Sequence, residues 1–90
     1  MAVNTTRITI GADAWTDVGG GQPFVTVFTE ETRVTYLHIG QEAPPIDTPH
    51  RFALPSGFEN AANLSLGVGD KVFALSGEGS VHVIVLAGST

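Results

Sequence analysis

The chain contains three histidines, His38, His50 and His82, and these side chains have the strongest capacity for metal chemistry. Imidazole ligands of a zinc site normally come as closely spaced pairs or together with cysteine. Here the spacings match neither an HxH nor an HxxxH pattern, and the sequence has no cysteine. We therefore interpret the histidines as hydrogen-bonded locally or solvated, and we expect no metal and no cofactor.

Two pairs of carboxylates could serve acid–base chemistry or hold a cation. Glycosidases place two carboxylates on either side of the bond that they cleave. Glu30 and Glu31 are adjacent, so in an extended chain their side chains point apart. Asp13 and Asp17 flank Trp15 in a polar stretch, where aspartate commonly caps a turn. The carboxylates thus predict solvated and turn-capping roles.

A nucleophilic set could be drawn from Ser76, His82 and Asp70. The sequence has no GxSxG motif, which would mark a nucleophile elbow. The glycine triplet at 19–21 opens no helix and is not followed by GK[ST], so it is not a phosphate loop. No base and nucleophile can be paired from the residues, and we expect that the protein is not an enzyme.

Trp15 is the only tryptophan and lies in a polar turn. It could stack on a sugar ring or anchor in a partner protein. It could equally fold back over the open end of the domain, and large aromatic side chains are most often packed in this way. We favour packing for Trp15, and we interpret all five phenylalanines as core residues: Phe24, Phe28, Phe52, Phe58 and Phe73.

The elements that position these residues are extended. Val72–Ser76 and Ser80–Ala87 are apolar runs separated by the glycine-rich segment 77–79, which is the pattern of a β-hairpin. Apart from His82, both faces of the second run are apolar, which is typical of a strand that is buried on both sides. The pattern predicts a hairpin that supplies two central strands.

Further strands are expected at Ala2–Ile10, Phe24–Thr29, Arg33–Ile39, His50–Leu54 and Leu64–Leu66. Phe24–Ile39 would form a second hairpin. The segment 11–17 is expected to be a turn, 19–23 a flexible connector, and the proline-rich segment 40–49 an ordered loop or arm. No window shows helical periodicity. The chain therefore predicts a single all-β domain over residues 1–90, a small antiparallel β-sandwich or β-barrel of six or seven short strands. Residues 1–7 are expected to form an extended N-terminal arm.

Composition narrows the class of partner. The 90 residues carry a net charge of −5, and their four basic residues are scattered, which argues against nucleic-acid binding. No apolar run is long enough to cross a bilayer, and the first residues lack the apolar region of a signal peptide, so we expect synthesis in the cytoplasm. A small core without disulfides favours a homo-oligomer.

A pattern of short motifs covers most of the chain. It runs through Trp15–Val18, Glu42–Pro45, Phe52–Gly57 and Asp70–Gly79 and ends in a valine-rich strand. The pattern resembles the small β-rich virion proteins encoded in the structural gene clusters of tailed bacteriophages. The resemblance implies a head-decoration (cement) protein or the base of a head fibre. Such a protein binds the outer surface of the capsid, commonly as a trimer, with the major capsid protein as its partner.

Two segments are expected to contact the capsid or a neighbouring subunit, namely the arm 1–7 and the proline loop 41–49, together with the apolar last strand. The candidate contact residues are Val3, Thr5, Arg7, Trp15, Pro44, Pro45, Ile46, Ile84 and Leu86. An alternative is a carbohydrate- or receptor-binding module of a fibre or tail component, with Trp15 as the stacking platform. A tail or connector component from the same gene clusters is a third hypothesis.

Overall fold

The computed structural model describes residues 2–20, 23–29, 34–54 and 61–89, and in these ranges every regular element is a β-strand. The strands are β1 (Ala2–Ile10), β2 (Thr16–Gly20), β3 (Phe24–Thr29), β4 (Thr35–Gly40), β5 (Phe52–Leu54), β6 (Ala62–Ser65), β7 (Lys71–Ser76) and β8 (Val81–Ser89). A search of the same ranges for a helix with the length and apolarity to span a membrane found none.

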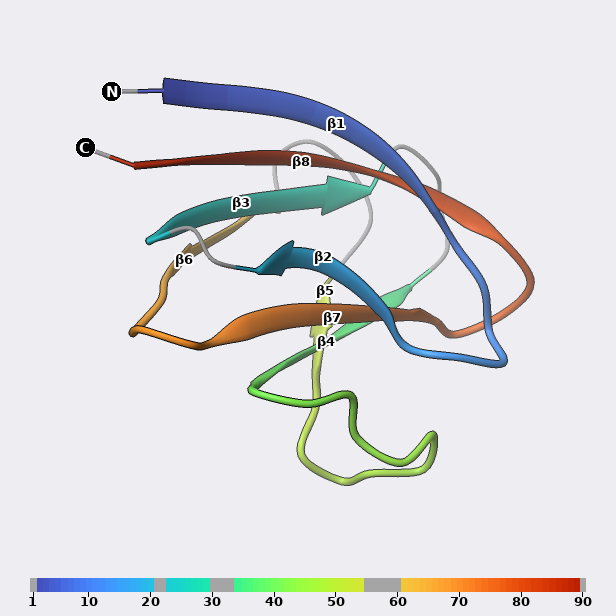
Figure 1. Ribbon diagram of the computed structural model, residues 1–90. Helices are drawn as coiled ribbons and strands as arrows, with labels where there is room; N and C mark the ends of the chain where they lie inside the picture. Colours follow the sequence, from blue (N-terminus) through green and yellow to red (C-terminus); the bar gives the residue numbers. More distant parts are fainter. Residues whose placement is uncertain (1, 21–22, 30–33, 55–60, 90) are drawn as a thin grey trace.

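The strands form two antiparallel sheets that lie one above the other (Figure 1). Sheet A has the order β1-β8-β3-β6, and sheet B has the order β2-β7-β4-β5. Four antiparallel pairs enclose one another along the sequence, from the innermost to the outermost: β4–β5, β3–β6, β2–β7 and β1–β8. Successive pairs belong alternately to sheet B and sheet A, as if one long hairpin were folded over. A long hairpin rolled up in this way is a jelly roll. The expected all-β antiparallel sandwich is confirmed, with β2 as an additional eighth strand.

Both expected hairpins are wrong. Strands β7 and β8 are each central, as expected, but β7 lies in sheet B and β8 in sheet A. Strands β3 and β4 are divided between the sheets in the same way. The turn before β8 still reverses the chain, with Gly79 at φ +63°. Its backbone is held by neighbouring segments, because Gly77 N donates to Val34 O at 2.9 Å and Ser76 N donates to Gly11 O at 3.0 Å. The glycine-rich reversal is therefore an arch between sheets.

The core lies between the inward faces of the two sheets. In sheet A the inward residues of β8 are valines 81, 83 and 85, and they pair with Ile10, Ile8 and Thr6 of β1. In sheet B, Val72 and Ala74 of β7 lie beside Ile39 and Leu37 of β4. The core cluster is almost wholly aliphatic, which agrees with the β-branched composition of the strands.

The turn expected over residues 11–17 is confirmed for 11–15, which form bends without regular secondary structure. Residues 21 and 22 of the expected flexible connector lie outside the described residues. The two interpretations are wrong for residues 16, 17, 19 and 20, which belong to strand β2. This strand pairs with β7, and its register shifts between Asp17 and Gly19. Asp17 Oδ1 accepts a hydrogen bond from Gly19 N at 3.1 Å, which is the turn-capping role expected for this aspartate. Gly19 is buried. The absence of a side chain at Gly19 permits close packing there.

The segment expected as an N-terminal arm lies in β1 from Ala2 onward and is paired with β8 along its whole length. Whether it also contacts another protein stays a prediction. The proline loop, residues 41–51, has no regular secondary structure and lies below sheet B in Figure 1.

Candidate docking surface

The outward face of sheet A carries a stripe of apolar side chains. In the sheet register, Ile84 lies opposite Phe28, and Leu86 lies opposite Thr26. Phe24 is two residues further along β3, diagonal to Leu86, and is 47% exposed. Phe28, Ile84 and Leu86 are half-buried. We call these four residues, Phe24, Phe28, Ile84 and Leu86, the apolar stripe.

Polar residues flank the stripe, and only one of them is charged. On the β1 side, Thr5 pairs with Leu86 and Arg7 pairs with Ile84. On the β6 side, Thr26 Oγ1 donates to Asn63 Oδ1 at 2.9 Å, so this pair is already satisfied within the sheet. Arg7 is the only Lys, Arg, Asp or Glu among the outward residues of the four strands, although the chain carries a net charge of −5. The face is thus nearly neutral in an acidic protein.

The outward face of sheet B is covered by its own chain. The rings of Trp15 and His38 lie 6.0 Å apart between centroids, and those of His38 and Phe73 lie 6.3 Å apart. Phe73 is only 5% exposed although its strand turns it away from the core between the sheets. The interpretation of Phe73 as a buried residue is confirmed, but it is buried in a second small aromatic cluster.

Hydrogen bonds fasten the proline loop over this cluster. Trp15 Nε1 donates to Pro45 O at 3.1 Å. His38 Nδ1 lies 2.6 Å from His50 O, and because a carbonyl oxygen only accepts, Nδ1 carries the hydrogen. Within the loop, Thr48 N donates to Pro45 O at 3.1 Å. Trp15 therefore packs against its own chain, and its N–H group is engaged.

A cation–π contact closes the loop where it enters β5. The guanidinium carbon of Arg51 lies 4.4 Å from the centre of the Tyr36 ring. Such contacts contribute about 0.5–1 kcal/mol at exposed sites. The loop is thus an ordered cover on sheet B.

The candidate contact residues fall into two groups on opposite sides of the sandwich. Positions 5, 7, 84 and 86 lie on the outward side of sheet A, and Val3 is paired with Gly88 in the same sheet. Trp15 and the loop residues 44–46 lie on the side of sheet B, where Ile46 is 45% exposed. One flat partner surface cannot contact both groups at once. Phe24 and Phe28 complete the sheet A group, and their place beside β8 could be found only from the strand order.

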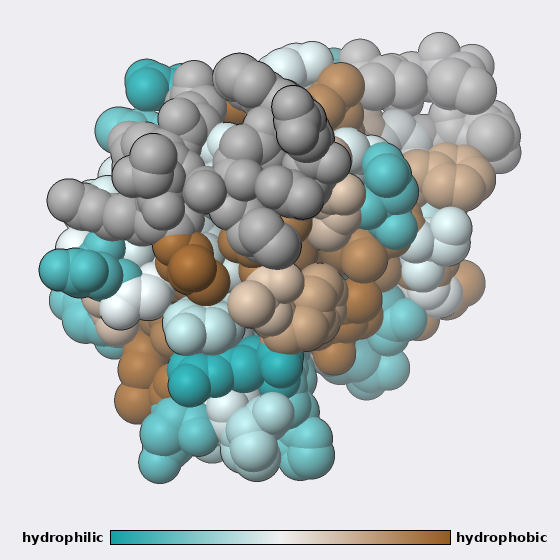
Figure 2. Space-filling model, turned by 180° about the vertical axis from the view of Figure 1, so that it is seen from behind, coloured by the Kyte–Doolittle hydropathy of each residue, from teal (hydrophilic) through white to brown (hydrophobic). Residues whose placement is uncertain are grey.

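The phenylalanines differ from the expected core positions in a consistent way. Phe24 is 47% exposed and Phe52 is 41% exposed, so their interpretation as core residues is wrong. Phe58 lies outside the described residues. Seen from behind, apolar residues lie across the middle of the view, above the hydrophilic residues at its lower end (Figure 2). Phe52 and Ile39 share the inward face of sheet B with Leu37 and Val72, so they form the rim of the core there.

The candidate catalytic set is not assembled. Ser76 is 2% exposed, and its Oγ donates to Glu78 O at 3.0 Å. Asp70 caps the preceding turn by accepting from Gly67 N at 3.1 Å. His82 faces outward on sheet A, opposite Thr9. Within the described ranges, no three His, Cys, Asp or Glu side chains lie close enough to hold a metal ion. Glu30 and Glu31 lie outside those ranges.

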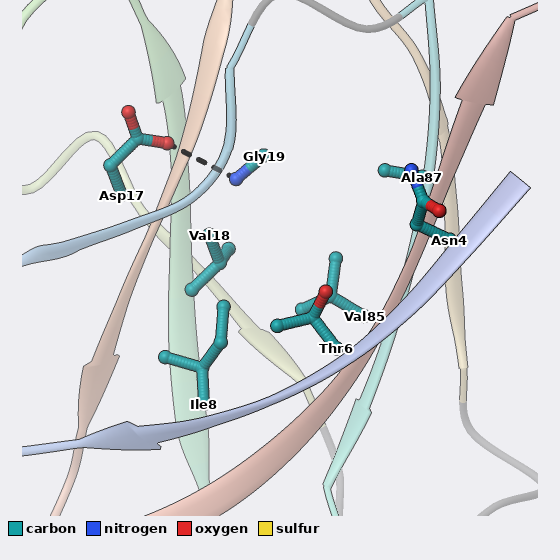
Figure 3. Close-up of a pocket in the computed structure, with 8 residues that line it drawn as sticks. All are labelled: Asn4, Thr6, Ile8, Asp17, Val18, Gly19, Val85 and Ala87. Atoms are coloured by element: carbon teal, nitrogen blue, oxygen red, sulfur yellow. Dashed lines mark hydrogen bonds between the residues drawn. The ribbon is translucent and has the colours of Figure 1, made fainter.

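A groove of about 350 Å³ opens between β1 and β2, where the two sheets separate (Figure 3). Ile8 and Val18 point toward each other at one end, Asn4 and Ala87 lie at the other, and Thr6 and Val85 lie between them. The carboxylate of Asp17 is turned away from the middle of the groove toward Gly19 N. The groove therefore presents hydroxyl, amide and methyl groups and no arrangement of reactive side chains.

Comparison with known proteins supports the fold. No protein-family model matches the chain, and no curated protein matches it. A solved structure described as "Crystal Structure of FeII HppE" superposes with a TM-score of 0.62 at 14% sequence identity. The match covers 94% of this chain and 43% of that chain, so this chain spans less than half of its structural neighbour. At this identity the likeness concerns the fold alone, and the iron named there belongs to that protein.

Proposed function

We propose that this protein is a non-catalytic attachment module that docks on a larger protein assembly through the outward face of sheet A. The observation that carries the proposal is the apolar stripe, which lies on a nearly neutral sheet face while the opposite face is covered by the proline loop. Apolar side chains that lie together on one outer face of a domain are characteristic of a protein–protein contact.

Docking through this face would proceed by burial alone. A standard interface buries roughly 1,600 Å² in total and needs no chemistry. Aromatic and aliphatic anchors near the centre of such an interface supply most of its binding free energy. Phe24 and Leu86 lie on the two inner strands of sheet A, and Thr5 and Thr26 lie on either side of Leu86.

The specific form of the proposal is capsid decoration. The motif pattern from Trp15 to the valine-rich last strand resembles tailed-phage virion proteins, and jelly rolls are used in viral capsid proteins as well as in lectins and cupins. In this form the major capsid protein is the partner, the head surface is the location, and the chain bridges neighbouring capsomers.

The carbohydrate-binding alternative has less support. A stacking platform needs an open aromatic face and polar groups able to reach sugar hydroxyls. Trp15 is half-buried, its N–H group donates to Pro45 O, and its ring lies against His38. These contacts give the indole a role in holding the loop.

Co-sedimentation with mature heads of the phage that encodes the chain tests the proposal, and two matched variants locate the surface. Phe24→Ser and Ile46→Ser each remove one large exposed apolar side chain, and the two positions lie on opposite sides of the sandwich. We expect saturable binding of the wild type, a loss of at least about fivefold in affinity for Phe24→Ser, and no change for Ile46→Ser.

Two results would contradict the proposal. A loss confined to Ile46→Ser would transfer the contact to the loop side. Absence of binding by the folded wild type would remove capsid decoration altogether.

A further inference from the structure

The four edge strands of the two sheets differ greatly in how they are protected against pairing. In the described part of the chain, β5 has three residues, β6 has four, and β2 has five with a register shift at Asp17. Short strands and bulges are the usual means by which proteins prevent edge pairing. Strand β1 has nine residues, no proline and a single charged residue, Arg7.

Strand β1 pairs with a described strand along only one of its two edges. The strand pairs with β8 in continuous register from Ala2 to Ile10, and no other described strand pairs with it. Among the described strands only β8 pairs with β1, so alternate residues of β1 turn their backbone N–H and C=O groups toward its second edge. Threonines 5, 6 and 9 are exposed, and this residue type favours extended structure.

The groove beside β1 is a second, independent observation. Asn4 and Thr6 belong to the inward face of β1, yet both are exposed, because the sandwich is open between β1 and β2. A strand added to the edge of β1 would extend sheet A over this opening (Figure 3). The added strand would form hydrogen bonds with the backbone groups at the edge of β1 and would also cover the groove.

We infer that the occupant is β1 of a second copy, paired antiparallel about a two-fold axis with Thr6 opposite the partner's Thr6. Pairing must keep the inward faces on one side of the sheet, so residues of equal parity oppose one another. Only the register centred on Thr6 overlaps all nine residues of both strands. Cross-strand threonine pairs are favourable in antiparallel sheets.

The charge of Arg7 also favours the register centred on Thr6. With Thr6 on the axis, Arg7 lies opposite the partner's Thr5, twice by symmetry. Centring the pair on position 7 would set two arginines directly opposite each other, which is destabilising. The pairing joins the two copies of sheet A into one continuous sheet. It is independent of the proposed attachment function, because it uses the edge of the sheet and that function uses its face.

Cysteine cross-linking of the full chain tests the pairing, since the chain contains no cysteine of its own. A disulfide needs Cα atoms roughly 4.4–6.8 Å apart, as in an antiparallel pair. We expect Thr6→Cys to form a covalent dimer under mild oxidation. Ser65→Cys, at an exposed position of the edge strand β6, serves as the matched control and stays monomeric. Equal cross-linking of both variants would overturn the inference.

Sedimentation equilibrium of two variants at one position tests the register. Thr5→Glu sets a carboxylate opposite the partner's Arg7, and we expect the dimer dissociation constant to fall by about fivefold. Thr5→Lys sets two cations opposite each other and should raise the constant by a similar factor. Added negative charge on an acidic chain would by itself weaken association, so a tighter dimer reports the specific pair.

The molar mass of the wild-type oligomer in solution distinguishes a dimer from a trimer. A two-fold pairing differs from the three-fold arrangement that the phage resemblance implies. A monomer at every soluble concentration, or a trimer whose stability does not respond to either substitution at position 5, would overturn the inference. Neither result bears on binding to heads, which the apolar stripe variants test separately.

Discussion

Gly19 of β2 lies directly against Val25 of β3, across the core from one sheet to the other. A Cβ atom at position 19 would stand 2.9 Å from both methyl carbons of Val25, and Val25 is 1% exposed. Real Cβ atoms do not approach other atoms so closely, so either the valine or the strand must shift. The absence of a side chain at position 19 thus allows the two sheets to approach beside the groove.

Gly19→Ala should therefore destabilise the fold by about 1–3 kcal/mol, the usual cost of overpacking a core. Urea unfolding followed by circular dichroism measures the change. In a Val25→Ala background the added methyl group has room, and the same substitution should cost much less. An equal cost in both backgrounds would show that the contact with Val25 is not the cause.

Strand β2 also shows where the sequence was insufficient. The segment Thr16–Gly20 has one aliphatic residue, and nothing in its pattern distinguishes a strand that packs through glycine from a flexible connector. Strands β3 and β8 could be predicted because runs of β-branched and aromatic residues mark them directly. The reason is that the sequence pattern of a strand shows which side chains share a face, but not to which sheet the strand belongs.

The same limit explains the two wrong hairpins and the incomplete site. A glycine-rich reversal such as that at Gly79 suits a hairpin within one sheet and an arch between two sheets equally well. Ile84 and Leu86 were found from their strand alone. Phe24 and Phe28 required the pairing of β3 with β8, which joins segments far apart in the chain.

Two buried threonines should respond in opposite directions to the same substitution. Thr35 is fully buried, and its Oγ1 has no hydrogen-bond partner among the described residues. Thr35→Val should raise the free energy of unfolding by up to about 1 kcal/mol, because a buried unpaired hydroxyl is costly.

Thr48 is 6% exposed, and its Oγ1 accepts from His50 N at 3.2 Å. Thr48→Val should lower the same quantity by about 1 kcal/mol. Thermal unfolding of both variants provides the comparison, and a loss of stability in Thr35→Val would show that its hydroxyl does have a partner.

The turn before β7 depends on Asp70. Its backbone N donates to Gly67 O at 3.2 Å, and its Oδ2 accepts from Gly67 N at 3.1 Å. Asp70→Ala should reduce the free energy of unfolding by about 0.5–1.5 kcal/mol, because Gly67 N loses its acceptor. Asp70→Asn keeps an acceptor oxygen and should cost less. Chemical denaturation distinguishes the two, and equal losses would indicate that the charge matters more than the hydrogen bond.

Trp15 should report on the proline loop and not on sugars. Its indole N–H is engaged with Pro45 O, so we expect its emission spectrum to stay unchanged when mono- and oligosaccharides are added. Trp15→Phe keeps an aromatic ring beside His38 but loses the hydrogen bond to the loop. The variant should therefore be cleaved faster by proteases within residues 41–51, while the β-sheet circular dichroism signal is retained. Phe52→Leu, at an exposed position outside the cluster, provides a control for general loosening. A saccharide-dependent shift in Trp15 emission, together with an unaltered cleavage rate in Trp15→Phe, would favour a stacking platform over a loop anchor.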